Sequence, residues 1–204
     1  MVKLYLVTNS DGFTEDEFLN IIGEACKGGV TLVQLREKEK NGREYYNLAV
    51  KVKAVTDTYS VPLIIDDRVD IALACGAAGV HVGQDDLPIA AARDIMGKGK
   101  MIGATAKTIE AALAAQKAGA DYLGVGAIYP TTTKVKTVLT PVDTLKDIVQ
   151  AVNIPVAAIG GLNAGNMDVL YGSGASGIAV VTAIMKSNNP KQTAEELNRL
   201  VENL

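Results

Sequence analysis

The chain has 204 residues, a length that suits one domain with a sizeable buried core. Its 20 basic and 23 acidic side chains leave a formal net charge of −3, which argues against a general nucleic-acid binder because such proteins carry a strong basic excess. Although 48% of the residues are hydrophobic, no apolar run reaches the roughly 18 residues that a transmembrane helix needs. We therefore expect neither a nucleic-acid nor a membrane partner.

The first residues and the cysteines bear on the compartment. The apolar start of the chain reaches the polar segment Thr8–Asp11 too soon to be a signal peptide. Cys26 and Cys75 form no paired motif, and they fit a reducing compartment better than a disulfide scaffold. The sequence therefore predicts a cytoplasmic protein.

Eight short runs rich in β-branched residues alternate with longer amphipathic segments along the chain. The predicted strands are Lys3–Val7, Thr31–Leu35, Pro62–Ile65, Gly79–Val82, Met101–Ala104, Tyr122–Val125, Pro155–Ile159 and Gly177–Val181. Several of these runs are apolar almost throughout, which is typical of parallel strands covered on both faces. The pattern therefore predicts an α/β fold.

Helical segments lie between the strands, the clearest being Thr14–Lys27, Gly42–Tyr59, Thr108–Ala118 and Pro190–Leu204. Thr14, with Glu17 three residues later, has the pattern of a capping box at the start of the first helix. Gly76, Gly119 and Gly172 stand where helices should end, which matches the preference for glycine in a left-handed cap. Each of these glycines is followed within a few residues by a predicted strand.

Eight βα units in 204 residues leave about 25 residues for each, near the lower size limit of a (β/α)₈ barrel. The alternative is an open doubly wound sheet, which usually has fewer strands and a glycine-rich first turn. The first strand here runs into Thr8–Asp11 without a GxGxxG motif, and no linker or composition shift divides the chain. We therefore predict a single-domain (β/α)₈ TIM barrel over residues 1–204.

Catalytic groups of such a barrel lie at the C-terminal ends of the strands and in the loops that follow. After the second predicted strand, alternation directs Gln34, Arg36 and Lys38 toward one side. A guanidinium and an ammonium group there could grip phosphate oxygens. The alternative for so short a segment is a solvated charged loop.

Two acidic pairs, Asp66-Asp67 and Asp85-Asp86, follow the third and fourth predicted strands. Adjacent parallel strands can bring these carboxylates within reach of one hard cation, and Mg²⁺ prefers a few carboxylates plus water and substrate phosphate. The alternative is that Asp67 or Asp86 caps the helix after its strand, which is a common role.

The loop after the sixth strand offers three hydroxyls and an ammonium group, from Thr131, Thr132, Thr133 and Lys134. These groups could donate hydrogen bonds to a phosphate, although a threonine-rich loop is also ordinary.

The loops after the last two strands carry Gly160-Gly161 and Val181-Thr182. Loops at these two places form the recurrent phosphate site of this fold, where backbone N–H groups face the anion and glycine permits close approach. The single histidine, His81, lies within the fourth predicted strand, which favours a packed or hydrogen-bonded structural role over that of a general base. Phosphate and metal chemistry is therefore the best supported class.

Seven segments in order along essentially the whole chain resemble the thiamine-phosphate synthase family, also called thiamine-phosphate pyrophosphorylase. They are Tyr5–Thr8, Val33–Lys38, Ile65–Arg68, Gly79–Asp86, Gly124–Lys134, Ile159–Gly161 and Gly177–Ile184. The combination of QLREK with PTTTK is the most specific part of the resemblance. The family fold is a (β/α)₈ barrel, which agrees with the strand count.

The resemblance implies a transferase of thiamine biosynthesis (EC 2.5.1.3) that uses Mg²⁺. In that reaction hydroxymethylpyrimidine diphosphate loses pyrophosphate, and the nitrogen of a thiazole phosphate attacks the exposed methylene carbon to give thiamine monophosphate. Negative charge builds on the leaving pyrophosphate, where the metal and nearby cations would stabilise it. No protein nucleophile or general base is required for such a displacement.

The resemblance also implies roles for individual residues. Asp67 and Asp86 would ligate Mg²⁺. The residues implied in catalysis are Arg36, Lys38, Thr105 and Lys134. Those implied to hold the pyrimidine diphosphate are Gln34, Arg36, Lys38, Asp66, Thr105 and Lys134, and those implied to hold the thiazole phosphate are Thr131, Thr132, Thr133, Gly161, Val181 and Thr182.

Two positions depart from the family pattern. The family usually has Asn where this chain has Asp66, and Ser where it has Thr105. Threonine keeps the hydroxyl, but Asp66 replaces a donor amide with an acceptor near a diphosphate, which adds repulsion unless a cation compensates. We expect Asp66→Asn to keep or improve activity.

Two other functions remain as alternatives. One is a thiazole tautomerase-like isomerase on the same barrel, against which the retained Arg36, Lys38, Asp67, Asp86 and Lys134 argue. The other is a non-catalytic sensor of a phosphate ligand, for which Asp66 leaves room. Expected partners are the two small-molecule substrates, and a homo-oligomer is left open.

Overall fold

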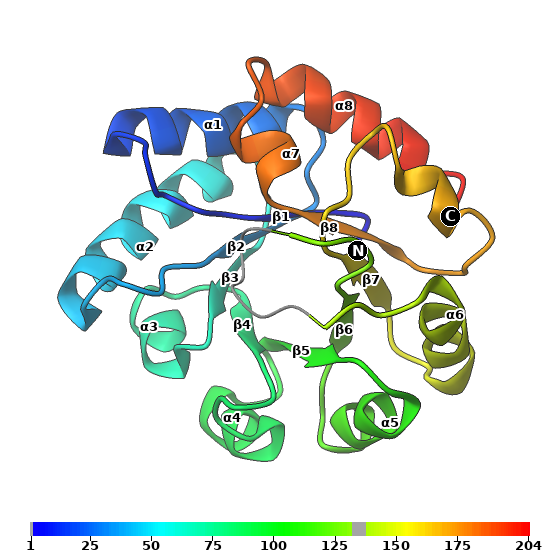
Figure 1. Ribbon diagram of the computed structural model, residues 1–204. Helices are drawn as coiled ribbons and strands as arrows, with labels where there is room; N and C mark the ends of the chain where they lie inside the picture. The colour runs from blue at the N-terminus through cyan, green and yellow to red at the C-terminus, as the bar shows by residue number, and fades with distance from the viewer. Residues whose placement is uncertain (1, 132–137) are drawn as a thin grey trace.

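The computed structural model describes residues 2–131 and 138–204, and it contains a closed barrel of eight parallel strands (Figure 1). The strands follow one another around the barrel in chain order, and the last pairs with the first, with Leu6 beside Val180. Their bounds are β1 (Leu4–Val7), β2 (Leu32–Leu35), β3 (Leu63–Asp66), β4 (Gly79–Val82), β5 (Met101–Ala106), β6 (Tyr122–Gly126), β7 (Val156–Ile159) and β8 (Gly177–Val180). The predicted fold class is confirmed, and each predicted strand is present with ends that differ by at most two residues.

Helices surround the barrel as an outer ring (Figure 1). They are α1 (Glu15–Lys27), α2 (Gly42–Thr58), α3 (Val69–Ala74), α4 (Ile89–Met96), α5 (Ile109–Lys117), α6 (Val142–Ala151), α7 (Thr182–Met185) and α8 (Pro190–Val201). A 3₁₀ helix, η1 (Met167–Leu170), takes the place of an α-helix after β7. Glycines at 161, 165, 172 and 174 punctuate that segment, and each disfavours a helix interior by about 1 kcal/mol relative to alanine.

Capping residues set several helix ends as predicted. The Thr14 hydroxyl accepts from the backbone N–H of Glu17, whose carboxylate accepts from the Thr14 N–H in return. Gly76, Gly119 and Gly172 have φ angles of +69°, +100° and +71°, in the left-handed region where glycine costs least. The first two follow α3 and α5, whereas Gly172 follows the 3₁₀ helix.

Alternation along the strands sorts the buried side chains into two layers. In β1, Leu4 and Leu6 belong to the larger core between strands and helices, whereas Tyr5 and Val7 belong to the barrel interior. The interior also contains Tyr122, which packs edge to face with Tyr5 at a ring-centroid distance of 5.8 Å and an interplanar angle of 77°. Two phenolic hydroxyls are therefore enclosed by the barrel.

A glycine on β5 makes room for these rings. A Cβ atom at Gly103 would collide with the Tyr122 ring and would lie 2.5 Å from Nδ1 of His81. The glycine therefore lets a tyrosine and a histidine of two other strands meet inside the barrel.

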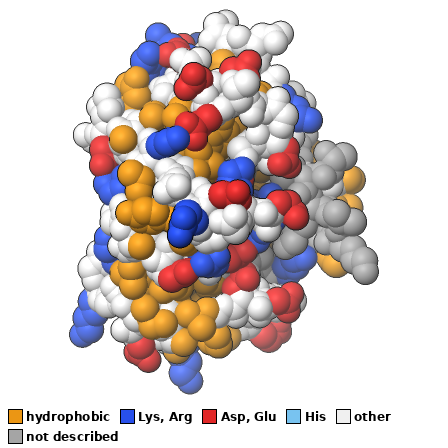
Figure 2. Space-filling model, turned by 90° about the vertical axis from the view of Figure 1, so that its left-hand side faces the viewer, with side chains coloured by type: hydrophobic (Ala, Val, Ile, Leu, Met, Phe, Trp, Pro, Cys, Tyr) orange, Lys and Arg blue, Asp and Glu red, His pale blue; other side chains and the backbone are white. Residues whose placement is uncertain are grey.

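The surface carries interspersed charges of both signs. On the face shown in Figure 2, basic and acidic side chains lie interspersed among stretches of apolar side chains. Among the described residues, no helix combines the length and apolar character needed to span a bilayer.

Candidate active site

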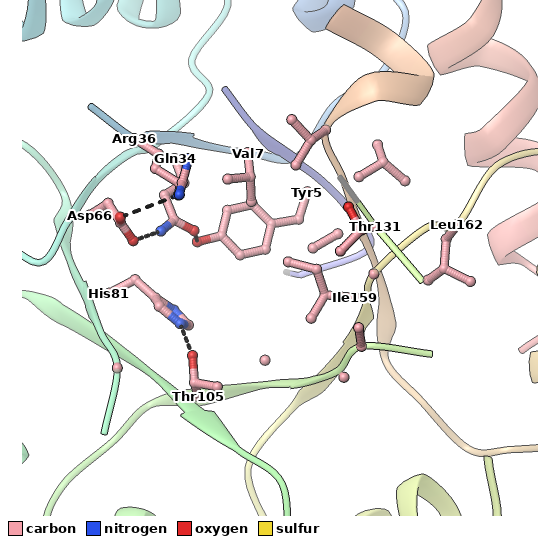
Figure 3. A pocket seen from close by; sticks show the side chains of 18 of the residues that line it. Tyr5, Val7, Gln34, Arg36, Asp66, His81, Thr105, Thr131, Ile159 and Leu162 are labelled. Carbon is pink, nitrogen blue, oxygen red and sulfur yellow. Dashed lines mark hydrogen bonds and ion pairs between the residues drawn. The ribbon is translucent and has the colours of Figure 1, made fainter. Parts of the chain in front are cut away.

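A cavity of about 200 Å³ lies where the C-terminal ends of the strands meet (Figure 3). Every strand contributes to its wall, from Tyr5 on β1 to Val180 on β8. In a parallel barrel all strands end at the same rim, so residues distant in the chain converge there. The cavity is the place where the predicted site residues should gather.

The structure brings most of the predicted residues together around this cavity. Those that line it are Gln34, Arg36, Lys38, Asp66, Asp67, Asp86, Thr105, Thr131, Gly161, Val181 and Thr182. Thr132, Thr133 and Lys134 lie outside the described residues. The residues that the sequence placed at the strand ends therefore line one and the same cavity.

The loop after β2 places its cations against the end of β3. The Lys38 ammonium lies 2.9 Å from Oδ2 of Asp66 and also pairs with Asp67. Arg36 Nε lies 3.9 Å from Oδ2 of Asp66 (Figure 3). Burial alone would lower the pKa of Lys38, but the charge of Asp66 and the hydrogen bonds to both carboxylates raise it above its usual value. Lys38 is therefore held as a cation at the rim of the cavity, and the alternative of a purely solvated loop does not describe it.

Asp67 and Asp86 approach each other from the loops after β3 and β4. Burial, followed by the charge of Asp66 and a hydrogen bond with Asp86, raises the pKa of Asp67 to about 6, although Lys38 opposes the shift. Oδ2 of Asp86 accepts from the backbone N–H of Gly83 at 2.7 Å. Neither carboxylate caps the following helix, because the N-cap residues of α3 and α4 are Arg68 and Pro88, and neither helix has a side-chain cap.

This pair of carboxylates fits a magnesium ion in the chemistry of its donors. The two groups supply hard oxygen ligands. Burial and the charge of Asp66 disfavour a second charged carboxylate at Asp67, and a bound cation would offset that cost. Among the described residues, no group of three or more His, Cys, Asp or Glu side chains could enclose a metal. The remaining ligands would have to be water and substrate phosphate, as is usual for Mg²⁺.

The opposite wall is built from backbone at the ends of β7 and β8. Gly160 and Gly161 have φ angles of +107° and +65°. A Cβ atom at Gly161 would lie 2.7 Å from Cβ of Tyr129 and 2.8 Å from the carbonyl oxygen of Pro130. The glycines therefore let two loops close together beside Val181 and Thr182, as the phosphate-site interpretation requires.

His81 is buried and hydrogen-bonded, as expected for the single histidine. Its Nε2 atom lies 3.0 Å from Oγ1 of Thr105, and its Nδ1 atom lies 3.3 Å from the hydroxyl of Tyr122. The ring also faces the cavity, beside Asp66, its register partner on β3 (Figure 3).

Sequence reasoning missed two polar residues of the cavity wall. Lys107 directly follows β5. The predicted strand ended two residues early, at Ala104, so the rule that polar residues directly after a strand face the site did not select Lys107. Tyr5 lies inside a strand. The available signal was the alternation of side chains along that strand, which places Tyr5 on the same inward face as Val7.

Comparison with known proteins gives concordant matches. A family model described as thiamine monophosphate synthase matches residues 4–184. The thiamine-phosphate synthase of Enterococcus faecalis is 51% identical over 203 residues, which cover 100% of this chain and 96% of the relative. That of Methanobrevibacter smithii is 52% identical over 196 residues, covering 96% and 93% of the two chains.

A solved structure agrees with these sequence matches. The thiamine phosphate pyrophosphorylase of Pyrococcus furiosus superposes with a TM-score of 0.90 at 38% identity, covering 98% of this chain and 96% of that one. A 3-hexulose-6-phosphate synthase from Salmonella typhimurium, with a TM-score of 0.72 and 17% identity, shares only the fold.

Proposed function

The chain belongs to the thiamine monophosphate synthase family, and we propose that the cavity at the C-terminal rim of its barrel is the active site. The protein is a thiamine-phosphate synthase, a transferase of EC 2.5.1.3. It condenses hydroxymethylpyrimidine diphosphate with thiazole phosphate to give thiamine monophosphate and pyrophosphate. The observation that carries our assignment of the site is the cluster of Arg36 and Lys38 at one end of the cavity, opposite the glycine-built wall.

The diphosphate would lie against Arg36 and Lys38. Carbon–oxygen bond cleavage places negative charge on the leaving pyrophosphate, and preorganised cations stabilise that charge more strongly as it develops. Asp66 and Asp67 hold the Lys38 ammonium at the cavity rim before substrate arrives, so little reorganisation is needed. Lys134, which lies outside the described residues, would add a further cation.

Asp67 and Asp86 would hold Mg²⁺ beside the diphosphate. When bound, the ion supplies Lewis-acid stabilisation of the phosphate oxygens. The chain's own part is to present two adjacent carboxylates and to fix Asp86 through its hydrogen bond from Gly83 at 2.7 Å.

The thiazole phosphate would lie at the wall formed by Gly161, Val181, Thr182 and Thr131, with Thr132 and Thr133 as further proposed contacts. Glycine at position 161 permits the close backbone approach that an anion site of this kind uses. Binding the two phosphates at opposite ends orients the thiazole nitrogen toward the methylene carbon, which supplies the proximity term of catalysis. A nucleophile or base from the protein has no step to perform in this displacement.

Asp66 stands beside the proposed diphosphate site, and its charge is compensated within the protein. Its carboxylate accepts from the Gln34 amide and pairs with Lys38. This pairing supports the view that Asp66 is tolerated at a position where a neutral amide would also serve.

Compartment, domain organisation and assembly are further proposals. The two free thiols, Cys26 and Cys75, support a reducing, cytoplasmic setting, and the closed barrel supports one domain over residues 1–204. Apolar side chains exposed on α3 and α4, such as Leu73 and Ile95, support a homo-oligomer, which light scattering would test.

The test is to incubate the purified protein with both substrates and Mg²⁺ and to follow pyrophosphate and thiamine monophosphate together. We expect the two products in equal amounts. Isomerised thiazole phosphate without pyrophosphate would indicate the tautomerase-like alternative. Tight substrate binding without any product would indicate a sensor.

A further inference from the structure

A continuous chain of hydrogen bonds crosses the barrel interior and joins three of the proposed substrate-binding residues. It runs through Asp66, Gln34, Tyr5, Tyr122, His81 and Thr105, which lie on β3, β2, β1, β6, β4 and β5. Most of its members are visible around the cavity in Figure 3. The three central members have no part in the mechanism given above.

One end of this chain has a fixed direction. The Gln34 amide nitrogen donates to Oδ1 of Asp66, and the Tyr5 hydroxyl donates to Oε1 of Gln34 at 2.5 Å. A carboxylate oxygen can only accept, so the amide nitrogen must face Asp66 and the amide oxygen must face Tyr5. The hydroxyl proton of Tyr5 is therefore used in the hydrogen bond to Gln34.

Counting protons fixes the direction of the remaining links. Because Tyr5 has given its proton to Gln34, it must accept in its 2.9 Å contact with the Tyr122 hydroxyl. Tyr122 has then used its own proton, so Nδ1 of His81, 3.3 Å away, must donate to it. A neutral imidazole has one N–H, so Nε2 of His81 must accept from the Thr105 hydroxyl at 3.0 Å.

Burial supports this count by keeping both phenols protonated. Tyr5 and Tyr122 are 2% and 1% exposed, and burial raises the pKa of each above its usual value. Each hydroxyl therefore has one proton to give.

We propose that Tyr5, Tyr122 and His81 are positioning residues that set the hydrogen-bonding direction of Gln34 and Thr105. His81 carries its proton on Nδ1, and Thr105 turns its lone pairs, with no free proton, toward the cavity. Thr105 therefore accepts from an N–H or O–H donor of the substrate, and the phosphate oxygens are left to cationic side chains. The identity of the ligand rests on the proposed function, whereas the direction of the chain does not.

The tautomer of His81 reports this direction, and it can be read by nitrogen NMR. His81 is the only histidine of the chain, so protein labelled with ¹⁵N-histidine gives one imidazole spectrum without assignment work. At pH 8, above the ordinary histidine pKa of about 6.5, we expect a protonated Nδ1 and an unprotonated Nε2. An Nε2–H tautomer or an imidazolium in the wild-type protein would overturn the proposal, whatever the protein's activity.

Tyr5→Phe tests the link between the tyrosines and the histidine. Without Tyr5 as acceptor, Tyr122 is free to donate to Nδ1, so we expect a substantial Nε2–H population. Tyr45→Phe is the matched control, because Tyr45 is a buried tyrosine whose hydroxyl lies 2.7 Å from the backbone carbonyl of Leu35 and 3.2 Å from that of Asp66. Both of these partners are backbone carbonyls, so the control leaves the side-chain hydrogen bonds of the chain in place. The control should keep the Nδ1–H tautomer, and an unchanged tautomer in Tyr5→Phe would contradict the proposal.

Tyr122→Phe gives a second test should Tyr5→Phe fail to fold, because it removes the acceptor of Nδ1–H directly and should also lose that tautomer. In kinetics, we expect either variant to lower kcat/KM for the pyrimidine diphosphate by up to about tenfold, the equivalent of one hydrogen bond, with the KM for thiazole phosphate unchanged. An equal effect on both substrates would indicate a merely structural role and would refute positioning.

Discussion

Replacing Gly161 with alanine tests the proposed thiazole-phosphate wall through two separate costs. The first cost is conformational, because φ at this residue is +65°. The second is crowding, because the new Cβ would lie 2.7 Å from Cβ of Tyr129 and 2.8 Å from the carbonyl oxygen of Pro130. These atoms belong to or adjoin the backbone, so neither can move aside as a flexible side chain could.

The magnitude of each cost follows from these contacts. A left-handed alanine costs about 1–2 kcal/mol, and overpacking adds about 1–3 kcal/mol. Gly172 is the matched control, since its φ is +71° and an added Cβ would meet no atom within 4 Å. Gly172→Ala should therefore lose only the first amount, and the difference between the two variants isolates the crowding.

Urea unfolding and steady-state kinetics together give the readout for Gly161→Ala. We expect its unfolding free energy to fall by about 1–3 kcal/mol more than that of Gly172→Ala. We also expect its KM for thiazole phosphate to rise, because the two loops must separate to admit the methyl group. Equal stability of the two variants, together with an unchanged KM, would refute this description of the wall.

Three further substitutions test other parts of the site. Asp86→Ala should abolish Mg²⁺-dependent turnover with an unchanged circular dichroism spectrum. Asp85 is an exposed neighbour outside the cavity wall, so Asp85→Ala should turn over like the wild type. Equal losses of activity in the two variants would show that Asp86 does not belong to the metal site. Asp66→Asn should keep or improve kcat/KM, because it removes a negative charge beside the diphosphate while Asp67 still pairs with Lys38. A loss of about tenfold or more in a folded variant would show that Asp66 has a role of its own. Gly103→Ala should lower the unfolding free energy by about 1–3 kcal/mol, since its Cβ would collide with Tyr122. An unchanged urea midpoint would show that the barrel interior can accommodate the added methyl group, against this expectation.

The barrel was predictable because each strand is a short apolar run with turn-forming residues on either side. Runs such as Gly79–Val82 are buried on both faces, and their largely apolar composition indicates this burial. The seventh unit was less predictable, since a 3₁₀ helix such as Met167–Leu170 has no periodicity that distinguishes it from a loop.

The members of the site were predictable from one rule of the fold, but their partners were not. Gln34 and Asp66 lie within the last two residues of their strands and Arg36 follows one, and parallel strands bring all three to one rim. That Lys38 pairs with Asp66, or that Tyr5 meets Gln34, depends on side-chain packing across the barrel. Such contacts join residues far apart in the chain, and no local pattern encodes them.

The kinetics of Lys38→Gln, with each substrate varied separately, test the central claim that the cationic end of the cavity holds the diphosphate. Glutamine is one atom shorter than lysine and keeps a hydrogen-bond donor, but it removes the charge that Asp66 and Asp67 position. Loss of one charge-assisted contact predicts that kcat/KM for the pyrimidine diphosphate falls about ten- to a hundredfold, with the KM for thiazole phosphate unchanged. A raised KM for thiazole phosphate, with unchanged kcat/KM for the diphosphate, would contradict it.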